Sequence, residues 1–250
     1  MIIGIVVDML ERKAIAKRLR NVVRHSQFSA VFQPIVDVNS MRPVGFEALT
    51  RFHVEPYRPP NEWFSDAKRV GVYSELEFSV HQKAVEQIAL LPTDTYVSVN
   101  VTEGSLLKRE VCALAFGINP ARVVLELSEQ EIVADYEAVK NALKPLRQMG
   151  VRLAVDDAGA GYASFWHILK LEPEIIKIDA KFVQNVDKHS AQKKFVGSML
   201  DYANHVGSIV VAEGVETEEE LSTLKDIGIN YVQGYLCGKP RPVVDVLMTI

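Results

Sequence analysis

Residues 151–165, VRLAVDDAGAGYASF, form an apolar strand pattern that ends on two adjacent aspartates. The run from Val151 to Val155 is interrupted only by Arg152, and a glycine-rich segment follows Asp156 and Asp157. A nearly continuous apolar strand is typical of a parallel sheet covered by helices. If the strand breaks at the aspartate pair, both carboxylates can turn toward the same place. This stretch therefore predicts a buried parallel strand with a polar site at its end.

The same kind of apolar run recurs along the chain. The runs cover residues 30–38, 44–52, 95–101, 122–129, 152–158, 174–180, 208–215 and 230–235. Helical stretches separate most of them, so this α/β pattern favours a TIM-like (β/α)8 barrel over an open sheet. Only VNSMRP, residues 38–43, joins the first two runs. That connection is too short for a crossover helix, which predicts an antiparallel first strand.

Length and composition favour a single domain over residues 1–250. The chain has 250 residues, of which 48% are hydrophobic, and a leading helical segment is expected within residues 1–28. In that segment Ile15, Leu19, Val22 and Val23 have helical spacing. The formal charge of −4 gives no basic surface, so binding to a nucleic acid polymer is not expected.

Cysteine usage and the first residues bear on the compartment. Cys112 and Cys237 lie far apart and lack the spacing of metal ligands, which is typical of free thiols in a cytoplasmic protein. The apolar run at residues 2–7 is too short to cross a membrane. No signal-peptide pattern surrounds it, so we expect neither export nor membrane insertion.

Polar residues fall within or at the C-terminal part of the predicted strands. They are Glu47, Asn100, Glu126, Asp156, Asp157, Lys177, Glu213 and Gln233. Taken singly, each is more often a helix cap, a solvated group or a satisfied polar side chain. In a barrel, however, these positions converge on one face, where active sites are built. Crowded carboxylates are costly without a cation, so the set predicts a metal site.

Carboxylates and an asparagine carbonyl are hard oxygen ligands, which suit Mg²⁺ or Mn²⁺ rather than zinc. His81, His167 and His205 are predicted in helices, and no histidine accompanies Ser98 or Ser128 in a nucleophilic site. Several carboxylates need more than one cation. The pattern therefore indicates a two-metal centre, whose usual chemistry is in-line displacement at phosphorus.

The motifs that carry these residues resemble those of EAL domains, bacterial phosphodiesterases that hydrolyse cyclic di-GMP. They are FQPIVD (32–37), GFEALTRF (45–52), SVNVT (98–102), LELSE (125–129), DDAGAGYAS (156–164), KID (177–179), AEGVET (212–217) and QGYL (233–236). The resemblance extends over roughly residues 15 to 245. It implies a barrel with an antiparallel first strand, Mg²⁺ or Mn²⁺ as cofactor, and linear pGpG as product.

The resemblance also implies roles for individual residues. The implied metal ligands are Glu47, Asn100, Glu126 and Asp156, with Asp157 serving a second ion and Glu213 holding or activating the attacking water. Lys177 is implied near that water and the scissile phosphate, and Gln233 contacts the water or substrate. Arg51, Leu49 and Gln33 are implied in substrate binding, and Glu129 as the anchor of a mobile loop. For Arg51 and Lys177 the alternative is a salt bridge to the surrounding carboxylates.

The chain departs from the family pattern at three positions. Ala158 and Ala160 stand where relatives usually have Phe and Thr or Ser, which concerns loop ordering and regulation rather than the chemistry. Lys68 stands where the family often has Glu. The alternatives to a phosphodiesterase are a cyclic di-GMP receptor without turnover and a metal-dependent lyase acting on enolates. We also expect a homodimer and a possible regulatory protein partner, whose identity the sequence does not give.

Overall fold

The computed structural model describes residues 2–108, 118–128, 131–159 and 163–248. Strands β1 to β8 form a closed barrel in chain order. They are β1 (Phe28–Asp37), β2 (Pro43–Phe52), β3 (Tyr96–Val101), β4 (Val123–Ser128), β5 (Arg152–Ala158), β6 (Ile175–Ile178), β7 (Ile209–Ala212) and β8 (Tyr231–Gln233). Each predicted apolar run overlaps one strand, so the predicted barrel is confirmed.

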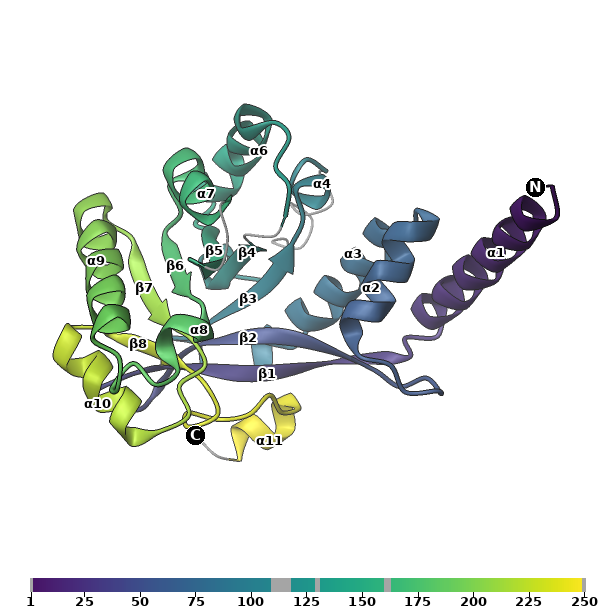
Figure 1. Cartoon of the computed structure of the whole chain (residues 1–250). Coiled ribbons are helices and arrows are strands. Elements are labelled where there is room, and N and C mark those ends of the chain that lie inside the picture. Colours follow the sequence, from purple (N-terminus) through teal and green to yellow (C-terminus); the bar gives the residue numbers. More distant parts are fainter. Residues whose placement is uncertain (1, 109–117, 129–130, 160–162, 249–250) are drawn as a thin grey trace.

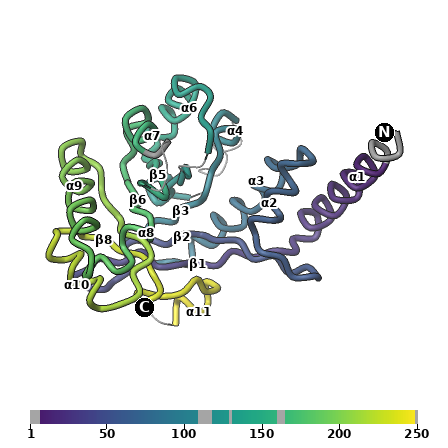
Figure 2. Tube along the Cα trace, in the orientation of Figure 1, coloured from purple at the N-terminus to yellow at the C-terminus, as the bar shows by residue number. Residues whose placement is uncertain are grey.

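The first strand runs against both of its neighbours. β1 is antiparallel to β2 and β8, whereas the pairs from β2 to β8 are parallel. Its connection to β2 is a tight turn in which the Asp37 carboxylate accepts hydrogen bonds from the backbone of Asn39 and Ser40. The tube in Figure 2 shows purple β1 beside yellow β8, where the two ends of the chain close the barrel. The prediction of an antiparallel first strand is confirmed.

Helices surround the barrel and extend from one end of it. They are α1 (Ile2–Arg24), α2 (Pro60–Val70), α3 (Tyr73–Val85), α4 (Glu103–Leu106), α6 (Tyr136–Gln148), α7 (Ala163–Leu171), α8 (Ala180–Val183), α9 (Ser190–Val206), α10 (Glu218–Ile227) and α11 (Val243–Leu247), with short 3-10 turns η1 (Ile88–Leu90) and η2 (Pro120–Arg122). In Figure 1, α2 and α3 lie side by side near one end of the long β1–β2 pair, and α1 projects beyond them. No helix among the described residues is long and apolar enough to cross a membrane.

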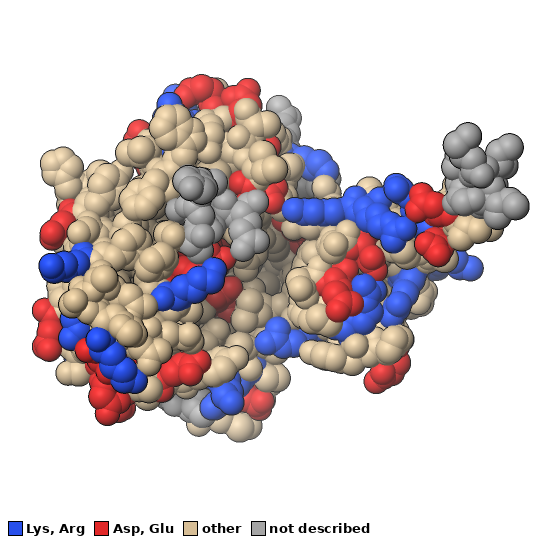
Figure 3. Space-filling view, viewed as in Figure 1, with Lys and Arg blue, Asp and Glu red and all other residues tan. Residues whose placement is uncertain are grey.

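The leading helix packs through the face expected from its spacing. Leu19 and Val22 of α1 are buried in a cluster with Trp63 of α2 and Leu76 of α3, and Ile15 and Val23 pack against the same cluster. Burial of this apolar stripe holds α1 to α2 and α3. The basic side chains of α1 are exposed, apart from the half-buried Arg18. Figure 3 shows blue atoms over the projecting arm.

The barrel interior has an apolar layer beneath a polar one. The apolar layer contains Ile35, Val124, Ala154, Ile175 and Val211. Side chains on one face of a strand recur every two residues. Two positions further along are Glu126, Asp156 and Lys177 of β4 to β6, and Glu213, which follows the last residue of β7. The barrel therefore places four charged groups directly above its apolar interior, at the C-terminal end of the parallel strands.

Candidate active site

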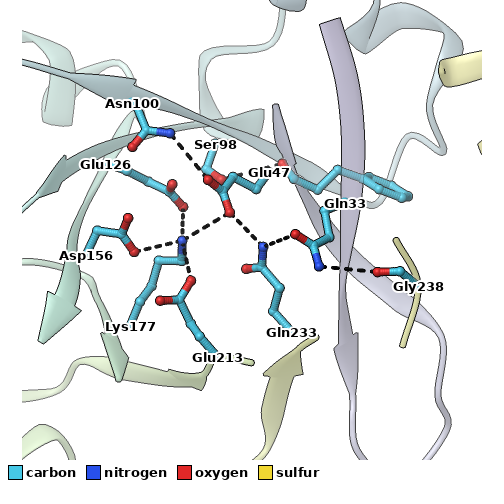
Figure 4. Close-up of polar contacts among 11 residues, drawn as sticks. Gln33, Glu47, Ser98, Asn100, Glu126, Asp156, Lys177, Glu213, Gln233 and Gly238 are labelled. Atoms are coloured by element: carbon cyan, nitrogen blue, oxygen red, sulfur yellow. Dashed lines mark hydrogen bonds and ion pairs between the residues drawn. The ribbon is translucent and has the colours of Figure 1, made fainter. Parts of the chain in front are cut away.

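Lys177 lies in the middle of the polar layer. Its Nζ is 2.8 Å from Glu213 Oε1, 2.9 Å from Asp156 Oδ1, 3.1 Å from Glu126 Oε1 and 3.5 Å from Glu47 Oε2. Figure 4 shows the ammonium enclosed by these four carboxylates, which come from β2, β4, β5 and the end of β7. The side chain of Lys177 is 1% exposed. One buried cation thus balances only part of the negative charge around it.

Glutamine and asparagine side chains fix the position of Glu47. Gln233 Nε2 donates to Glu47 Oε2 at 2.6 Å and to Gln33 Oε1 at 3.3 Å, and Asn100 Nδ2 donates to Glu47 Oε1 at 3.3 Å. Gln33 is the register partner of Glu47 across the β1–β2 pair and donates to the carbonyl of Gly238 at 3.2 Å. Because both oxygens of Glu47 are engaged, its carboxylate is held in one orientation.

Burial and like charges shift the ionisation of this cluster. Burial raises the pKa of Glu126 to about 8, with Glu47 and Asp156 adding to the rise and Lys177 opposing it. Burial and then Asp156 raise the pKa of Glu213 above its ordinary value. Burial alone would lower the pKa of Lys177, but the four carboxylates outweigh it and raise the pKa. The cluster therefore favours an additional positive charge.

An irregularity in β5 brings the adjacent aspartates together. The β5–β6 register shifts between Val155 and Ala158, and Asp157 has a φ of 56°. Neighbouring residues of a regular strand point to opposite faces, so the irregularity is what lets both carboxylates approach one place. Oxygen atoms of Asp156, Asp157 and Glu213 lie within 4.8 Å of one another. The sequence predicted a strand break at the aspartate pair; β5 instead continues to Ala158, and the irregularity lies within the strand.

The donor set fits hard divalent cations. Asp156, Asp157 and Glu213 form the group of potential ligands found among the described residues. Glu126 Oε2 and Gln233 Oε1 are buried without a hydrogen-bond partner in the described part of the chain. Carboxylate and amide oxygens suit Mg²⁺ or Mn²⁺, and the unpartnered acceptors leave lone pairs for such an ion.

A cavity of about 610 Å³ adjoins this centre. Leu49 and Arg51 of β2 and Asn100 of β3 line it on the barrel side, and residues of α2 and α3 line the other side. Glu47, Leu49 and Arg51 occupy alternate positions of β2 and so share one face of the strand. In Figure 3 this face of the molecule is hollowed between the barrel and the helical arm, with acidic side chains inside the hollow.

Comparison with known proteins identifies the family. A model of the EAL domain family matches residues 16–240. The chain belongs to the EAL domain family. It is 28% identical over 255 residues to the cyclic di-GMP phosphodiesterase PdeF of Escherichia coli (strain K12), and the match covers 97% of this chain and 34% of that protein. This EAL chain spans about a third of the length of the curated relatives it matches.

Solved structures of EAL proteins have the same fold. The PaMucR phosphodiesterase in complex with c-di-GMP matches with a TM-score of 0.82 and 26% identity, covering 93% of this chain and 99% of that chain. The manganese and cy-diGMP complex of Klebsiella pneumoniae BlrP1 matches with a TM-score of 0.77 and 30% identity, covering 86% of this chain and 56% of that chain. The predicted family and its barrel are both confirmed.

Salt bridges were the alternative role for Lys177 and Arg51, and the structure of this EAL chain gives a different answer for each. Lys177 does form ion pairs with the surrounding carboxylates. Arg51 instead donates to the carbonyl of Thr50 at 2.8 Å, and no ion pair to Arg51 occurs among the described residues. The Arg51 guanidinium is therefore available to the cavity that it lines.

The predicted helical histidines lie in α3, α7 and α9. His81 Nε2 donates to the backbone carbonyl of Asn100 at 2.6 Å, and burial lowers its pKa to about 4. Neutral His81 thus supports the backbone at Asn100 in this EAL site. Glu129 and Ala160 lie outside the described residues, so the loop anchor remains a prediction.

The cavity wall formed by α2 and α3 was not predicted. It includes Phe64, Lys68, Tyr73 and Glu77, and Glu131 joins it from the segment after β4. These residues lie on helices, so polarity at strand ends does not indicate them. The helical spacing of apolar residues within 60–70 could have indicated this wall. It buries Trp63 and Ala67 on one face of α2 and leaves the Lys68 side chain 56% exposed.

Proposed function

We propose that this EAL domain, residues 1–250, is a metal-dependent phosphodiesterase that hydrolyses cyclic di-GMP to linear pGpG. The observation that carries the proposal is the buried cluster of carboxylates around Lys177, next to a cavity lined by Arg51. The relatives named for this activity, and those solved with cyclic di-GMP, support the choice of substrate.

The metal would be Mg²⁺ or Mn²⁺, as two ions held by the oxygen donors of the site. The proposed ligands are Glu47, Asn100, Glu126, Asp156, Asp157 and Glu213. Bound there, such ions would polarise the phosphoryl oxygens and lower the pKa of the attacking water. The buried acceptors without partners and the close grouping of Asp156, Asp157 and Glu213 support this assignment.

The protein side chains would then orient and neutralise the reacting groups. Glu213 and Gln233 face the centre and would hold the attacking water through their oxygen atoms. The Lys177 ammonium would offset charge that develops on the transferring phosphoryl group. These roles require no movement of Glu47, since Gln233 and Asn100 already hold it.

The substrate would extend from this centre into the cavity. A cyclic dinucleotide has two phosphates and two bases, so the half that does not react needs its own space. Arg51 offers a planar donor fork that suits a phosphate, and Leu49 offers apolar contact. Gln33, the register partner of Glu47 on β1, would contact the substrate beside Glu47.

We also propose a homodimer formed through α7. Phe165, Trp166 and Leu169 on this helix are 45%, 51% and 52% exposed. Large apolar side chains grouped on one exposed helix are typical of interaction surfaces. The substitution Leu169→Glu should convert a dimer into a monomer in light scattering after size exclusion; an unchanged mass would exclude this surface.

The central test is incubation of the purified protein with cyclic di-GMP and either Mg²⁺ or Mn²⁺. We expect pGpG in chromatography and none after treatment with EDTA. Binding without cleavage in the presence of both metals would instead indicate a cyclic di-GMP receptor. An active-site control is Asp156→Asn, which should abolish cleavage because it removes one of the proposed carboxylate ligands.

A further inference from the structure

An ion pair crosses the rim of the cavity. Lys68 Nζ of α2 lies 3.2 Å from Glu131 Oε2, which belongs to the segment between β4 and α6. The same ammonium lies 5.1 Å from the centre of the Tyr73 ring. Both partners line the cavity that also contains Arg51 and Asn100. A cation and an anion therefore face the space into which the substrate would extend.

The wall around Glu131 is rich in acidic groups. Burial, and to a smaller extent the charge of Glu131, raises the pKa of Glu77 to about 7. Glu77 and Glu131 line the same cavity. An anionic ligand that approaches this wall would be repelled by Glu131 unless a nearby cation offsets the charge. Lys68 is the cation paired with Glu131 in the described part of the chain.

The ion pair is poorly suited to hold α2 in place. The side chain of Lys68 is 56% exposed and that of Glu131 is 21% exposed, so solvent reaches the ammonium and weakens the contribution of the pair to stability. Other contacts hold this helix: Trp63 and Ala67 are buried, and Arg58 lies 2.7 Å from carboxylate oxygens of both Glu62 and Asp66. Lys68 can therefore leave Glu131 without displacing the helix that carries it.

We propose that Lys68 is a substrate-affinity residue that exchanges Glu131 for a phosphate of the bound dinucleotide. Glu131 lowers substrate affinity, because it competes for the same ammonium and repels the same phosphate. The inference rests on the proposed function and adds a residue that sets affinity from the α2 wall of the cavity. The chemistry is ordinary ion-pair exchange, and a flexible lysine stem permits it.

The test uses two substitutions that break the same ion pair. Lys68→Gln should raise the KM for cyclic di-GMP about threefold to tenfold, whereas Glu131→Gln should lower it by about twofold to fivefold. The kcat should stay within about twofold in both, since neither side chain reaches the carboxylate centre. Lys68→Arg should retain the parental KM. The control pair is Lys140→Gln and Glu172→Gln, an exposed ion pair of 3.9 Å that does not line the cavity.

Opposite shifts of KM for Lys68→Gln and Glu131→Gln establish the exchange. Shifts in the same direction would mean that the ion pair itself is needed, and unchanged values would mean that Lys68 does not meet the substrate; either result overturns the inference. If the parent binds cyclic di-GMP without cleaving it, the dissociation constant from calorimetry replaces KM, and the same opposite signs are expected. A parent that neither binds nor cleaves would refute the proposed function and the inference together.

Discussion

The Lys177 ammonium and the Glu213 carboxylate form a buried ion pair, with Nζ 2.8 Å from Oε1. Lys177 lies on β6, and Glu213 follows the last residue of β7. Three more carboxylates lie within 3.5 Å of the same nitrogen. Lys177 therefore offsets carboxylate repulsion in the folded protein, and under the proposed function the same ammonium would lie beside the reacting phosphate.

The first prediction concerns Lys177→Met. Turnover should fall by about 10² to 10³ in kcat, with a smaller change in KM, since the ammonium offsets charge that develops during displacement. Removal of one partner of a buried ion pair also costs about 3–5 kcal/mol. In EDTA at pH 8 the Tm of Lys177→Met should therefore be lower than that of the parent. Mg²⁺ should reduce this difference in Tm. Lys181→Met is the control, because that side chain is 73% exposed. A defect confined to KM would make Lys177 a ground-state binding residue.

The second prediction concerns metal removal. Mg²⁺ or Mn²⁺ should raise the Tm, because an ion that binds only the folded carboxylate cluster stabilises it by mass action. Asp157→Asn should weaken this effect, since it removes charge from the group that contains Asp156 and Glu213. Ca²⁺ should raise the Tm but inhibit turnover, because it prefers longer bonds and more ligands. Differential scanning fluorimetry and a pGpG assay measure the two effects; equal turnover with Ca²⁺ and Mg²⁺ would contradict the argument from ion size.

The third prediction concerns Gly159, which follows the irregular end of β5. Its φ is 102°, and a Cβ there would lie 2.8 Å from atoms of both Phe182 and Phe195. These rings are stacked with centroids 4.2 Å apart and cannot easily yield. Gly159→Ala should therefore displace Asp157, two residues earlier, and raise the Mg²⁺ concentration needed for half-maximal activity by about tenfold.

Gly207 is a control that distinguishes backbone strain from steric conflict at Gly159. Gly207 also has a positive φ, 78°, but a Cβ there would meet nothing within 4 Å. Gly207→Ala should cost about 1–2 kcal/mol of stability and leave the Mg²⁺ titration unchanged. Identical Mg²⁺ titrations for Gly159→Ala and Gly207→Ala would show that the contact with the two phenylalanines is unimportant.

The fourth prediction concerns pH and Glu77. Burial raises the pKa of this carboxyl from 4.5 to about 7, despite hydrogen bonds from Ser105 and Thr102. Because the folded-state pKa is raised, its contribution to stability is complete below pH 4.5 and is lost as the pH rises through 7. Glu77→Gln mimics the protonated acid, so it should stabilise the protein by about 1–3 kcal/mol at pH 8 and much less at pH 5.

Chemical denaturation at the two pH values measures this difference. Glu75→Gln is the control, because Glu75 lies on the same helix with a side chain that is 51% exposed. It should show nearly the same stability as the parent at both pH values. If Glu77→Gln raises the free energy of unfolding equally at pH 5 and pH 8, titration of Glu77 is not the cause of the increase.

The order of the strands and the composition of the polar layer follow from local patterns. The short link between β1 and β2 excludes a crossover helix, and this alone predicts their antiparallel pairing. Likewise Glu126 and Asp156 follow apolar interior residues by two positions, and a strand must turn both to the same face. These features depend on residues close in sequence, so one sequence was enough to predict them.

The sequence by itself determined an eight-stranded barrel with carboxylates on one face, because strand periodicity and connection length act locally; the order of its motifs indicated the EAL family. Only the tertiary structure decided which groups meet. Lys177 and Glu47 are 130 positions apart, and Lys68 and Glu131 are 63 apart. Their contacts depend on barrel closure, on the irregularity in β5 and on the packing of α2 against α1 and α3. Periodicity shows which side chains share one face of a helix or strand. It does not show which distant residues pack against that face, so it cannot predict these contacts.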